Sequence, residues 1–141
     1  MLKPLALLMA SALVVGCSNG ETVMSDRSIL PCADKPNCVS TQDGREKYSL
    51  APFVLKPNAT LEAIETVALN LGRAKTADRQ ENYLRIEYTS KVFRFVDDLE
   101  LRIIDDKLIV RSESRTGHSD LGVNRKRADA LRAALLAAGL I

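Results

Sequence analysis

The polar side chains that could take part in acid–base chemistry gather between a predicted strand and the last predicted helix. His118 is the only histidine of the 141 residues, so any imidazole chemistry depends on it. Arg115 and Asp120 flank His118, and Asp97 precedes them on a strand. These four side chains would serve an enzyme of unspecified reaction. We expect a binding protein rather than an enzyme, because the sequence has no Gly-x-Ser-x-Gly elbow, phosphate loop, His-x-x-x-His pair or dinucleotide fingerprint.

A second group of charged residues could bind an anion at the start of the last predicted helix. The run Arg125-Lys126-Arg127 stands where the helix dipole disfavours cations. An anion site would combine helix N–H groups with Arg115, His118 and Arg125 around a phosphate or carboxylate. The alternative is a solvated basic turn offset by nearby aspartates. With their predicted strand neighbours, the candidate binding residues are Asp97, Arg111, Ser114, Arg115, His118, Asp120, Asn124 and Arg125.

Cys17 ends an N-terminal segment that has the pattern of an export signal. A basic start precedes an apolar run over residues 5–15, which is shorter than the roughly 20 residues that span a bilayer. The run ends in Val14-Val15-Gly16-Cys17, which resembles the lipobox of bacterial lipoproteins. The resemblance implies that residues 1–16 are removed and that Cys17 carries a diacylglycerol and a further acyl chain such as palmitate. The alternative is an ordinary cleaved signal in which Cys17 is incidental.

The residue after the cysteine bears on the compartment. By the same resemblance, Ser18 in place of aspartate favours the outer membrane of a diderm host, with the domain facing the periplasm. The membrane is then one partner of the protein, held through the lipid anchor.

Cys32 and Cys38 are the only other cysteines, and two close cysteines in an exported chain predict a structural disulfide. Closing so small a loop would contribute roughly 2.4 kcal/mol. Free thiols are one alternative, and a metal or redox site is another. Zinc needs four ligands, of which His118 would be the only other Cys or His candidate, and the spacing is not that of a Cys-x-x-Cys redox motif. We therefore expect no metal and no cofactor.

The composition narrows the domain organisation and the partners. Removal of residues 1–16 leaves 125 of the 141 residues, enough for one domain with a core. The chain has 20 Lys and Arg against 18 Asp and Glu and no Trp, which argues against a nucleic-acid partner. Residues 17–30 are small and polar and predict a lipidated flexible tether, and residues 31–141 form a single globular domain.

The first half of this domain is predicted to contain one strand and one helix. A strand over residues 48–55 would lie at a sheet edge because Pro52 cannot donate a hydrogen bond. A helix follows, with Thr60 or Asn58 as its N-cap and Gly72 as its stop.

The second half predicts strands and then a helix. Alternation over residues 82–89 and 93–103 is typical of strands, and it places Phe93 and Phe95 on the inward side. A helix over about residues 124–138 follows. This order predicts an α+β fold, a curved antiparallel sheet of about four to five strands with two helices packed on one face.

Asp105 and Asp106 predict a two-residue turn, which sets the register of the strands on either side. Ile103 then pairs with Leu108, and Glu100 with Arg111, whereas a three-residue turn would pair Arg102 with Val110.

The same two-residue register brings Asp97 opposite Ser114. Asp97 has inward parity, so we expect it to accept hydrogen bonds from the loop over residues 114–125, whereas Asp98 should face outward and matter little. The alternatives are a ligand-binding or catalytic carboxylate, or a bulge that exposes Asp97.

Three blocks of the sequence resemble a known family. They are Pro36-Asn37-Cys38-Val39-Ser40, Phe95-Val96-Asp97-Asp98-Leu99-Glu100, and Val110 to Arg115 continued by Ser119 to Arg125. In this order they are similar to the signature blocks of domain-of-unknown-function family 1499, over about residues 30–138. The resemblance implies one compact domain and no assigned activity. Members usually have an aromatic residue in place of His118, which weighs against a catalytic role for this histidine.

The sequence thus favours a membrane-anchored envelope lipoprotein. Its domain is expected to bind a small anionic or amphipathic ligand or another envelope protein. The alternatives are the enzyme described above and a structural accessory of envelope assembly. An enzyme should bring its polar groups into one concave pocket, whereas a protein-binding module should expose an apolar patch or a free strand edge.

Overall fold

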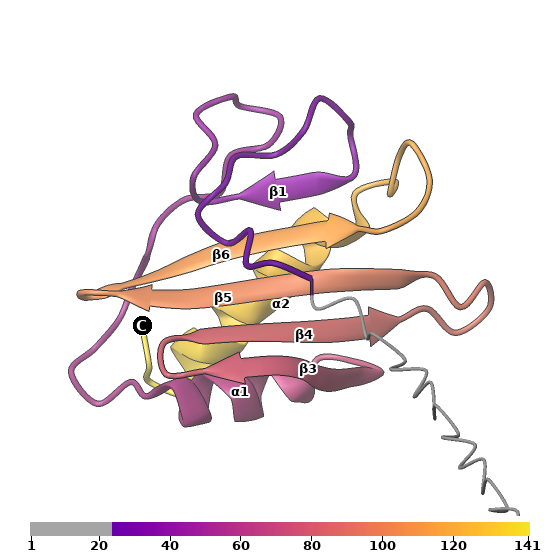
Figure 1. Cartoon of the computed structure of the whole chain (residues 1–141). Coiled ribbons are helices and arrows are strands. Elements are labelled where there is room, and N and C mark those ends of the chain that lie inside the picture. Colours follow the sequence, from indigo (N-terminus) through magenta and orange to yellow (C-terminus); the bar gives the residue numbers. More distant parts are fainter. Residues whose placement is uncertain (1–23) are drawn as a thin grey trace, which may run out of the picture.

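The computed structural model describes residues 24–141, which form one antiparallel sheet with two helices on one of its faces (Figure 1). The spatial order of the strands is β1-β6-β5-β4-β3, and the short β2 pairs with β6 beside this path. The sheet is open, and the α+β fold that the sequence predicts is confirmed, with six strands. In chain order the elements are β1 (Cys38–Ser40), β2 (Phe53–Val54), α1 (Leu61–Leu69), β3 (Ala74–Gln80), β4 (Tyr83–Thr89), β5 (Val96–Ile104), β6 (Lys107–Ser114) and α2 (Val123–Ala137). The predicted signal, Cys17 and the first part of the predicted tether lie outside the described residues.

The hairpin of β5 and β6 has the predicted register. Ile103 pairs with Leu108 and Glu100 pairs with Arg111. Asp105 and Asp106 make the turn, and Asp105 has the positive φ of 52° that such a tight turn requires. The register also carries Ser114 to the position opposite Asp97, as predicted.

The start of β5 differs from the prediction. The strand begins at Val96, and the preceding residues form a loop closed by Ser90, whose N–H donates to the Phe95 carbonyl at 2.9 Å. Arg94 has a φ of 57°, which no strand can continue through. Phe93 and Phe95 are 74% and 54% exposed, so the prediction that they face the core is wrong.

The sequence predicts β4 but not the edge strands β3 and β1. β4 matches the expected strand and turns Leu84 and Ile86 toward the helices. β3 forms the edge beside it, and its sequence Ala-Lys-Thr-Ala-Asp-Arg-Gln is too polar to show an apolar alternation. β1, at the opposite edge, is only three residues long.

The strand predicted over residues 48–55 is reduced to β2. Its two residues pair with Leu108 and Lys107 at the start of β6. Pro52 has no N–H to contribute to a longer ladder. The residues before it form a loop, in which the Leu50 N–H donates to the Ser40 carbonyl at 3.0 Å.

Both predicted helices are present on the same face of the sheet (Figure 1). Thr60 is the N-cap of α1, because its hydroxyl accepts from the Ala63 N–H at 3.1 Å. α1 ends at Leu69 with Asn70 as C-cap, before the predicted stop at Gly72. The end of α2 is followed by Gly139, whose φ of 69° suits a helix terminus.

The apolar core lies between these helices and the sheet. It contains buried side chains of both layers, which are Val39, Leu50, Phe53, Leu61, Ile64, Ala68, Leu84, Ile86, Tyr88, Leu99, Leu101, Leu108, Val110, Ala128, Leu131, Leu135 and Leu140. Cys32 and Cys38 form the predicted disulfide, packed with Tyr48 in a separate small cluster.

Residues 24–30, here called the strap, cross the other face of the sheet, where they run in front of β5 and β6 in Figure 1. The Arg27 N–H donates to Glu100 at 2.8 Å, and Arg102 binds both Asp26 and Ser28. The prediction that the flexible tether extends to residue 30 is therefore wrong for residues 26–28, which are part of the folded domain. Within residues 24–141, neither helix has the length and apolar character needed to cross a membrane.

Candidate functional site

A buried polar cluster lies between α2 and the ends of β5 and β6, and Asn124 is its centre. The Asn124 amide donates to Ser114 Oγ at 2.9 Å and to Asp120 Oδ2 at 2.7 Å. Its Oδ1 accepts from Ser112 Oγ at 2.6 Å and from Arg127 Nη1 at 2.7 Å. Asn124 carries no charge itself, and it thus satisfies polar groups of two further segments without adding one to the interior.

Asp97 belongs to this cluster through Arg127 rather than through the loop. Arg127 Nη2 donates to Asp97 Oδ2 at 2.7 Å, and both side chains are largely buried. The guanidinium also lies over the Tyr88 ring, 4.6 Å from its centroid. The predicted hydrogen bonds from the loop to Asp97 are wrong. A helix residue supplies them instead, because Arg127 lies one turn beyond Asn124 on the sheet-facing side of α2.

The start of α2 is already occupied by a side chain of its own loop. Asp120 accepts from the N–H groups of Gly122 and Asn124, each at 2.9 Å. Gly122, the N-cap, has a φ of 80° and offers no side chain of its own. Asp120 therefore takes the place at this terminus that the predicted anion would have filled.

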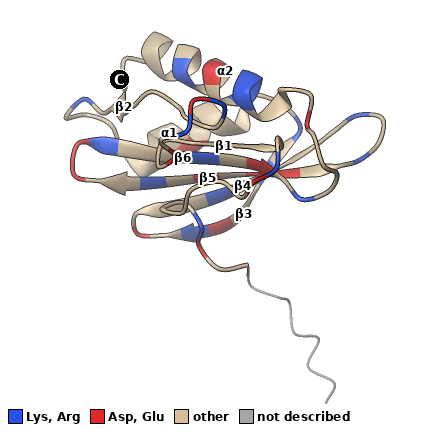
Figure 2. Ribbon diagram, turned by 90° about the horizontal axis from the view of Figure 1, so that it is seen from above, with Lys and Arg blue, Asp and Glu red and all other residues tan. Residues whose placement is uncertain are grey.

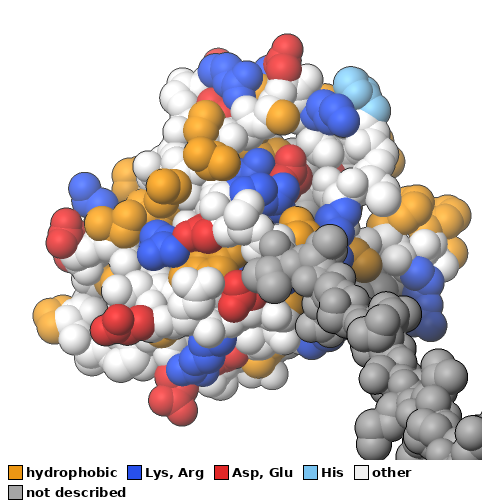
Figure 3. Space-filling model, in the orientation of Figure 1, with side chains coloured by type: hydrophobic (Ala, Val, Ile, Leu, Met, Phe, Trp, Pro, Cys, Tyr) orange, Lys and Arg blue, Asp and Glu red, His pale blue; other side chains and the backbone are white. Residues whose placement is uncertain are grey.

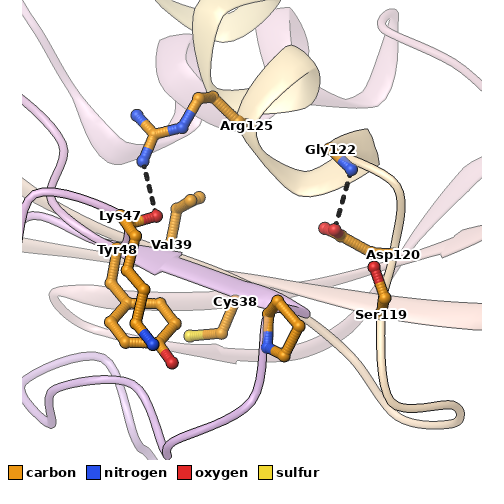
Figure 4. A pocket seen from close by; sticks show the side chains of 9 residues that line it. Cys38, Val39, Lys47, Tyr48, Ser119, Asp120, Gly122 and Arg125 are labelled. Carbon is orange, nitrogen blue, oxygen red and sulfur yellow. Dashed lines mark hydrogen bonds between the residues drawn. The ribbon is translucent and has the colours of Figure 1, made fainter.

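The other members of the predicted anion site lie apart. Arg125 Nη1 and Nη2 donate to the carbonyls of Ser49 and Lys47 at 3.0 and 3.1 Å. Figure 4 shows Arg125 reaching toward Lys47 and Asp120 turned toward Gly122, on two sides of a pocket of about 220 Å³. His118 is exposed on the loop, and Arg115 turns to the opposite face of the sheet.

On that opposite face the strap lies over ion-paired side chains of β4, β5 and β6, and Figure 2 shows residues of both charges along these strands. Asp98 has no exposed side-chain surface, and it contacts Arg115 at 2.7 Å, Arg85 at 3.3 Å and Arg27 at 3.7 Å. Glu100 is equally buried and lies 3.4 Å from Arg111 and 3.3 Å from Arg27. Asp98 lies on the sheet face away from the helices, as predicted. The expectation that it would therefore matter little is wrong. The strap and the neighbouring side chains bury this carboxylate among three guanidinium groups.

The charges of this network shift the protonation of its members. Burial opposes ionisation of Glu87, yet hydrogen bonds from Arg115 and Lys75 lower its pKa to about 2. The hydrogen bond with Asp98 raises the pKa of Arg115 above its already high ordinary value. Burial and the nearby Glu100 carboxylate raise the pKa of Tyr83, whose hydroxyl donates to Glu100 at 3.0 Å. All of these groups stay in one charge state at neutral pH, which indicates a structural role.

Seven of the eight candidate residues from the sequence therefore fall into three groups, and His118 lies apart from all of them. Asp97, Ser114, Asp120 and Asn124 meet around α2, whereas Arg111 and Arg115 lie on the strap face. Arg125 is turned toward the loop before β2. The His118 side chain makes no hydrogen bond to any of these residues within residues 24–141. The four residues of the predicted enzyme do not share one pocket, since Asp97 and Asp120 line the end cleft described next and Arg115 does not.

A cleft of about 310 Å³ opens at the end of the sheet where β5 begins and β6 ends. We call it the end cleft. One wall is the β4–β5 loop, with Phe93 and Phe95, and the other is formed by Leu121 of the loop after β6 and Val123 at the start of α2. The floor contains Asp97 and Ser114, and most of the lining is apolar.

A second hollow, of about 360 Å³, adjoins the end cleft and has several basic residues in its lining. It shares Ser90, Asp97 and Val123 with the end cleft. Arg73, Lys91, Lys126 and Arg127 also line it. Arg127 is engaged by Asp97, which leaves three further basic residues around the rim of what we call the basic hollow.

Sequence reasoning missed the walls of this site and Arg127. The two phenylalanines were assigned inward because they continue the parity of β5, and only the Ser90 loop breaks that parity. Arg127 could have been found from helical spacing, since it lies three residues after Asn124 on the face that contains Ala128 and Leu131. Within residues 24–141 no three His, Cys, Asp or Glu side chains are grouped as metal ligands.

Comparison with known proteins gives a family but no activity. A family model described as "Protein of unknown function (DUF1499)" matches residues 28–135. The match begins within the strap and includes both walls of the end cleft. No curated protein and no solved structure shows a significant match.

Asp98→Ala should destabilise the domain more than Asp97→Ala. Loss of Asp98 removes three ion pairs of a fully buried carboxylate, and Arg85 and Arg115 are then left to share Glu87 alone, which costs about 3–5 kcal/mol in the free energy of unfolding. Loss of Asp97 leaves one cation that retains its contacts with Asn124 and Tyr88, and should cost about 1–3 kcal/mol. Urea unfolding measures both, with the exposed Asp129→Ala as the control. An equal or smaller effect at Asp98 would contradict the buried network.

Glu87→Gln should destabilise the protein in a pH-dependent way. The folded-state pKa of about 2 lies below the ordinary 4.5, so the ionised carboxylate stabilises the fold fully above about pH 4.5. This contribution is lost as the pH falls from 4.5 toward 2, and the two proteins should then converge in stability. Urea unfolding between pH 2 and pH 7 checks this, with the exposed Glu81→Gln as control. A difference that stays constant over this range would refute the assignment.

Proposed function

The chain belongs to the family described as "Protein of unknown function (DUF1499)", and on that premise we propose a function from its own residues. The protein is an envelope lipoprotein anchored through Cys17, and its domain binds a small amphipathic molecule that has an anionic group. The proposal rests on one observation: the apolar end cleft and the basic hollow adjoin each other and share lining residues.

The end cleft suits the apolar part of such a ligand. Phe93 and Phe95 stack with their ring centroids 5.5 Å apart and form one wall, and Leu121 and Val123 form the other. A volume of about 310 Å³ lies within the range of small-molecule sites. Filling the cleft would remove exposed apolar surface from water, which is the main source of binding free energy for an alkyl chain.

The basic hollow suits an anionic head group. Lys91, Lys126 and Arg73 line it, and the carboxylate of Asp97 is compensated by Arg127 at 2.7 Å. An anion placed beside Val123 would therefore meet uncompensated positive charge while its alkyl chain entered the end cleft. This arrangement favours a fatty acid or a phosphate monoester of a long-chain alcohol over a neutral lipid.

The anchor is supported by the sequence pattern that ends in Val14-Val15-Gly16-Cys17. Ser18 supports the outer membrane, with the domain on its periplasmic side. Two or more acyl chains give stable attachment, since each buried methylene contributes about 0.8 kcal/mol. A protein attached to a membrane in this way is close to lipids, which supply ligands with alkyl chains.

Cys17→Ser should abolish the anchor. The variant cannot accept a diacylglycerol, so metabolic labelling with a fatty acid should disappear and the domain should leave the membrane fraction. Cys32→Ser is the matched control, because Cys32 is engaged in the disulfide and should leave labelling unchanged. Continued labelling of the Cys17→Ser variant at the original level would disprove the anchor.

Dodecanoate, below its micellar concentration, should bind to the mature chain of residues 17–141 carrying Cys17→Ser, as measured by titration calorimetry. Leu121→Asp should weaken binding by about tenfold or more, because it removes an apolar wall and adds a like charge. Leu136→Asp on the outer side of α2 is the control. Lys126→Glu should weaken dodecanoate more than dodecanol. Absence of dodecanoate binding, or equal losses in both leucine variants, would overturn the proposed ligand class.

A further inference from the structure

We infer that the tips of the two loops around the end cleft enter the surface of an anionic phospholipid bilayer, so that the domain sits with this end on the membrane. The inference concerns the exposed side chains of the loop tips, most of which also line the end cleft, and it goes beyond the binding of a dissolved ligand because the partner is a bilayer. It rests on the proposed anchor for the identity of the membrane and for the short distance between the domain and that membrane.

Half of the large hydrophobic side chains that are exposed in residues 24–141 lie at this end. They are Val92, Phe93, Phe95, Leu121 and Val123. Val92 is 79% exposed and Leu121 is 87% exposed. The remaining exposed hydrophobic residues are distributed over the strap, β2, β5 and α2. Figure 3 shows hydrophobic side chains gathered at the right-hand end of the molecule, with Lys and Arg directly beside them. An apolar patch of this kind on a protein surface marks a site of association.

The loops hold these side chains outward. The Ser90 hydroxyl accepts from the Phe95 N–H at 2.9 Å, and the Ser90 N–H donates to the Phe95 carbonyl, so the β4–β5 loop is closed by its own hydrogen bonds. Arg94 and Leu121 have φ values of 57° and 53°, a conformation that costs energy for residues with a side chain. The two tips are therefore built to project, and their apolar residues do not fold back onto the core.

The charges around the tips match an anionic surface. Lys91 and Arg94 flank Phe93, and no Asp or Glu occurs in residues 90–96 or 115–119. The nearest aspartates are engaged elsewhere, since Asp97 binds Arg127 and Asp120 caps α2. Apolar side chains between basic ones are the arrangement by which proteins insert into the head-group region of anionic membranes.

The short chain between Cys17 and the described residues keeps the domain close to the membrane. Met24 is seven residues from Cys17, and a chain extends by at most about 3.6 Å per residue, so the attachment lies within about 25 Å of the anchor. The start of the strap is fixed to the sheet through Asp26 and Arg102. A domain held this close must turn some surface to the bilayer, and the loop tips are the surface with the matching chemistry.

The absence of tryptophan from the chain permits a direct test. In the lipidated mature protein, Phe93→Trp and Val92→Trp each provide a single tryptophan at a tip, and Leu136→Trp provides one on α2. In vesicles of phosphatidylglycerol and phosphatidylethanolamine, both tip tryptophans should shift to shorter emission wavelength and be quenched by brominated acyl chains. The Leu136→Trp emission should remain unquenched. Tip tryptophans that stay accessible to iodide and unquenched by the brominated lipid would overturn the inference.

A second measurement separates the loops from the anchor. The unlipidated mature chain with Cys17→Ser should sediment with phosphatidylglycerol vesicles but not with phosphatidylcholine vesicles, and salt should weaken the binding. Phe93→Ser should reduce vesicle binding by about tenfold or more, and Leu136→Ser should not. Equal binding to both kinds of vesicle, or equal effects of the two variants, would count against the inference.

The two proposals can fail independently. If dodecanoate binds while the tip tryptophans stay in water, the inference is overturned and the ligand site remains. If the tips insert and dodecanoate does not bind in solution, the inference holds and the small-molecule site is overturned.

Discussion

The burial of one carboxylate, that of Asp98, holds the second face of the sheet together. A carboxylate without exposed surface is tolerated only among cations and hydrogen-bond donors. The cations around Asp98 are Arg85 of β4, Arg115 after β6 and Arg27 of the strap. The Asp98 carboxylate therefore links a strand, a loop and the start of the described chain. The strap has few apolar side chains to bury, and it is its ion pairs with this face that keep it in place.

The next residue along β5 faces the other way and organises the opposite layer. Because successive strand residues point to opposite faces, Asp97 meets Arg127 of α2 while Asp98 meets Arg27 of the strap. The pair of Asp97 with Arg127 fixes the start of α2 above the ends of β5 and β6. The loop that leads into α2 is therefore held against the β4–β5 loop, and the end cleft lies between them. A network that maintains the fold thus also places the surface that we propose to be functional.

Several features follow from local rules and are predictable from the sequence. The Asp105-Asp106 turn and the parity of the flanking residues determine the register of β5 and β6, because a slip by one residue would reverse which side chains are buried. Thr60 caps α1 through its own hydroxyl, and the two cysteines are close enough in sequence to pair. These depend on residues that are near one another in the chain. The candidate site is less predictable, since Asp97, Ser114, Asp120 and Asn124 come together as expected but with partners that the sequence does not indicate.

By itself the sequence determined the α+β class, the hairpin register, the disulfide and the inward side of Asp97, because each depends on spacing of a few residues. Only the tertiary structure decided that Phe93 and Phe95 are exposed, since a single loop closed by Ser90 ends the alternation on which their assignment relied. It also decided the partners of the charges. Arg27 and Glu100 are 73 residues apart, and their contact arises only when the strap crosses the finished sheet. Long-range ion pairs leave no periodic pattern in a sequence, and their location is set by the packing of the layers.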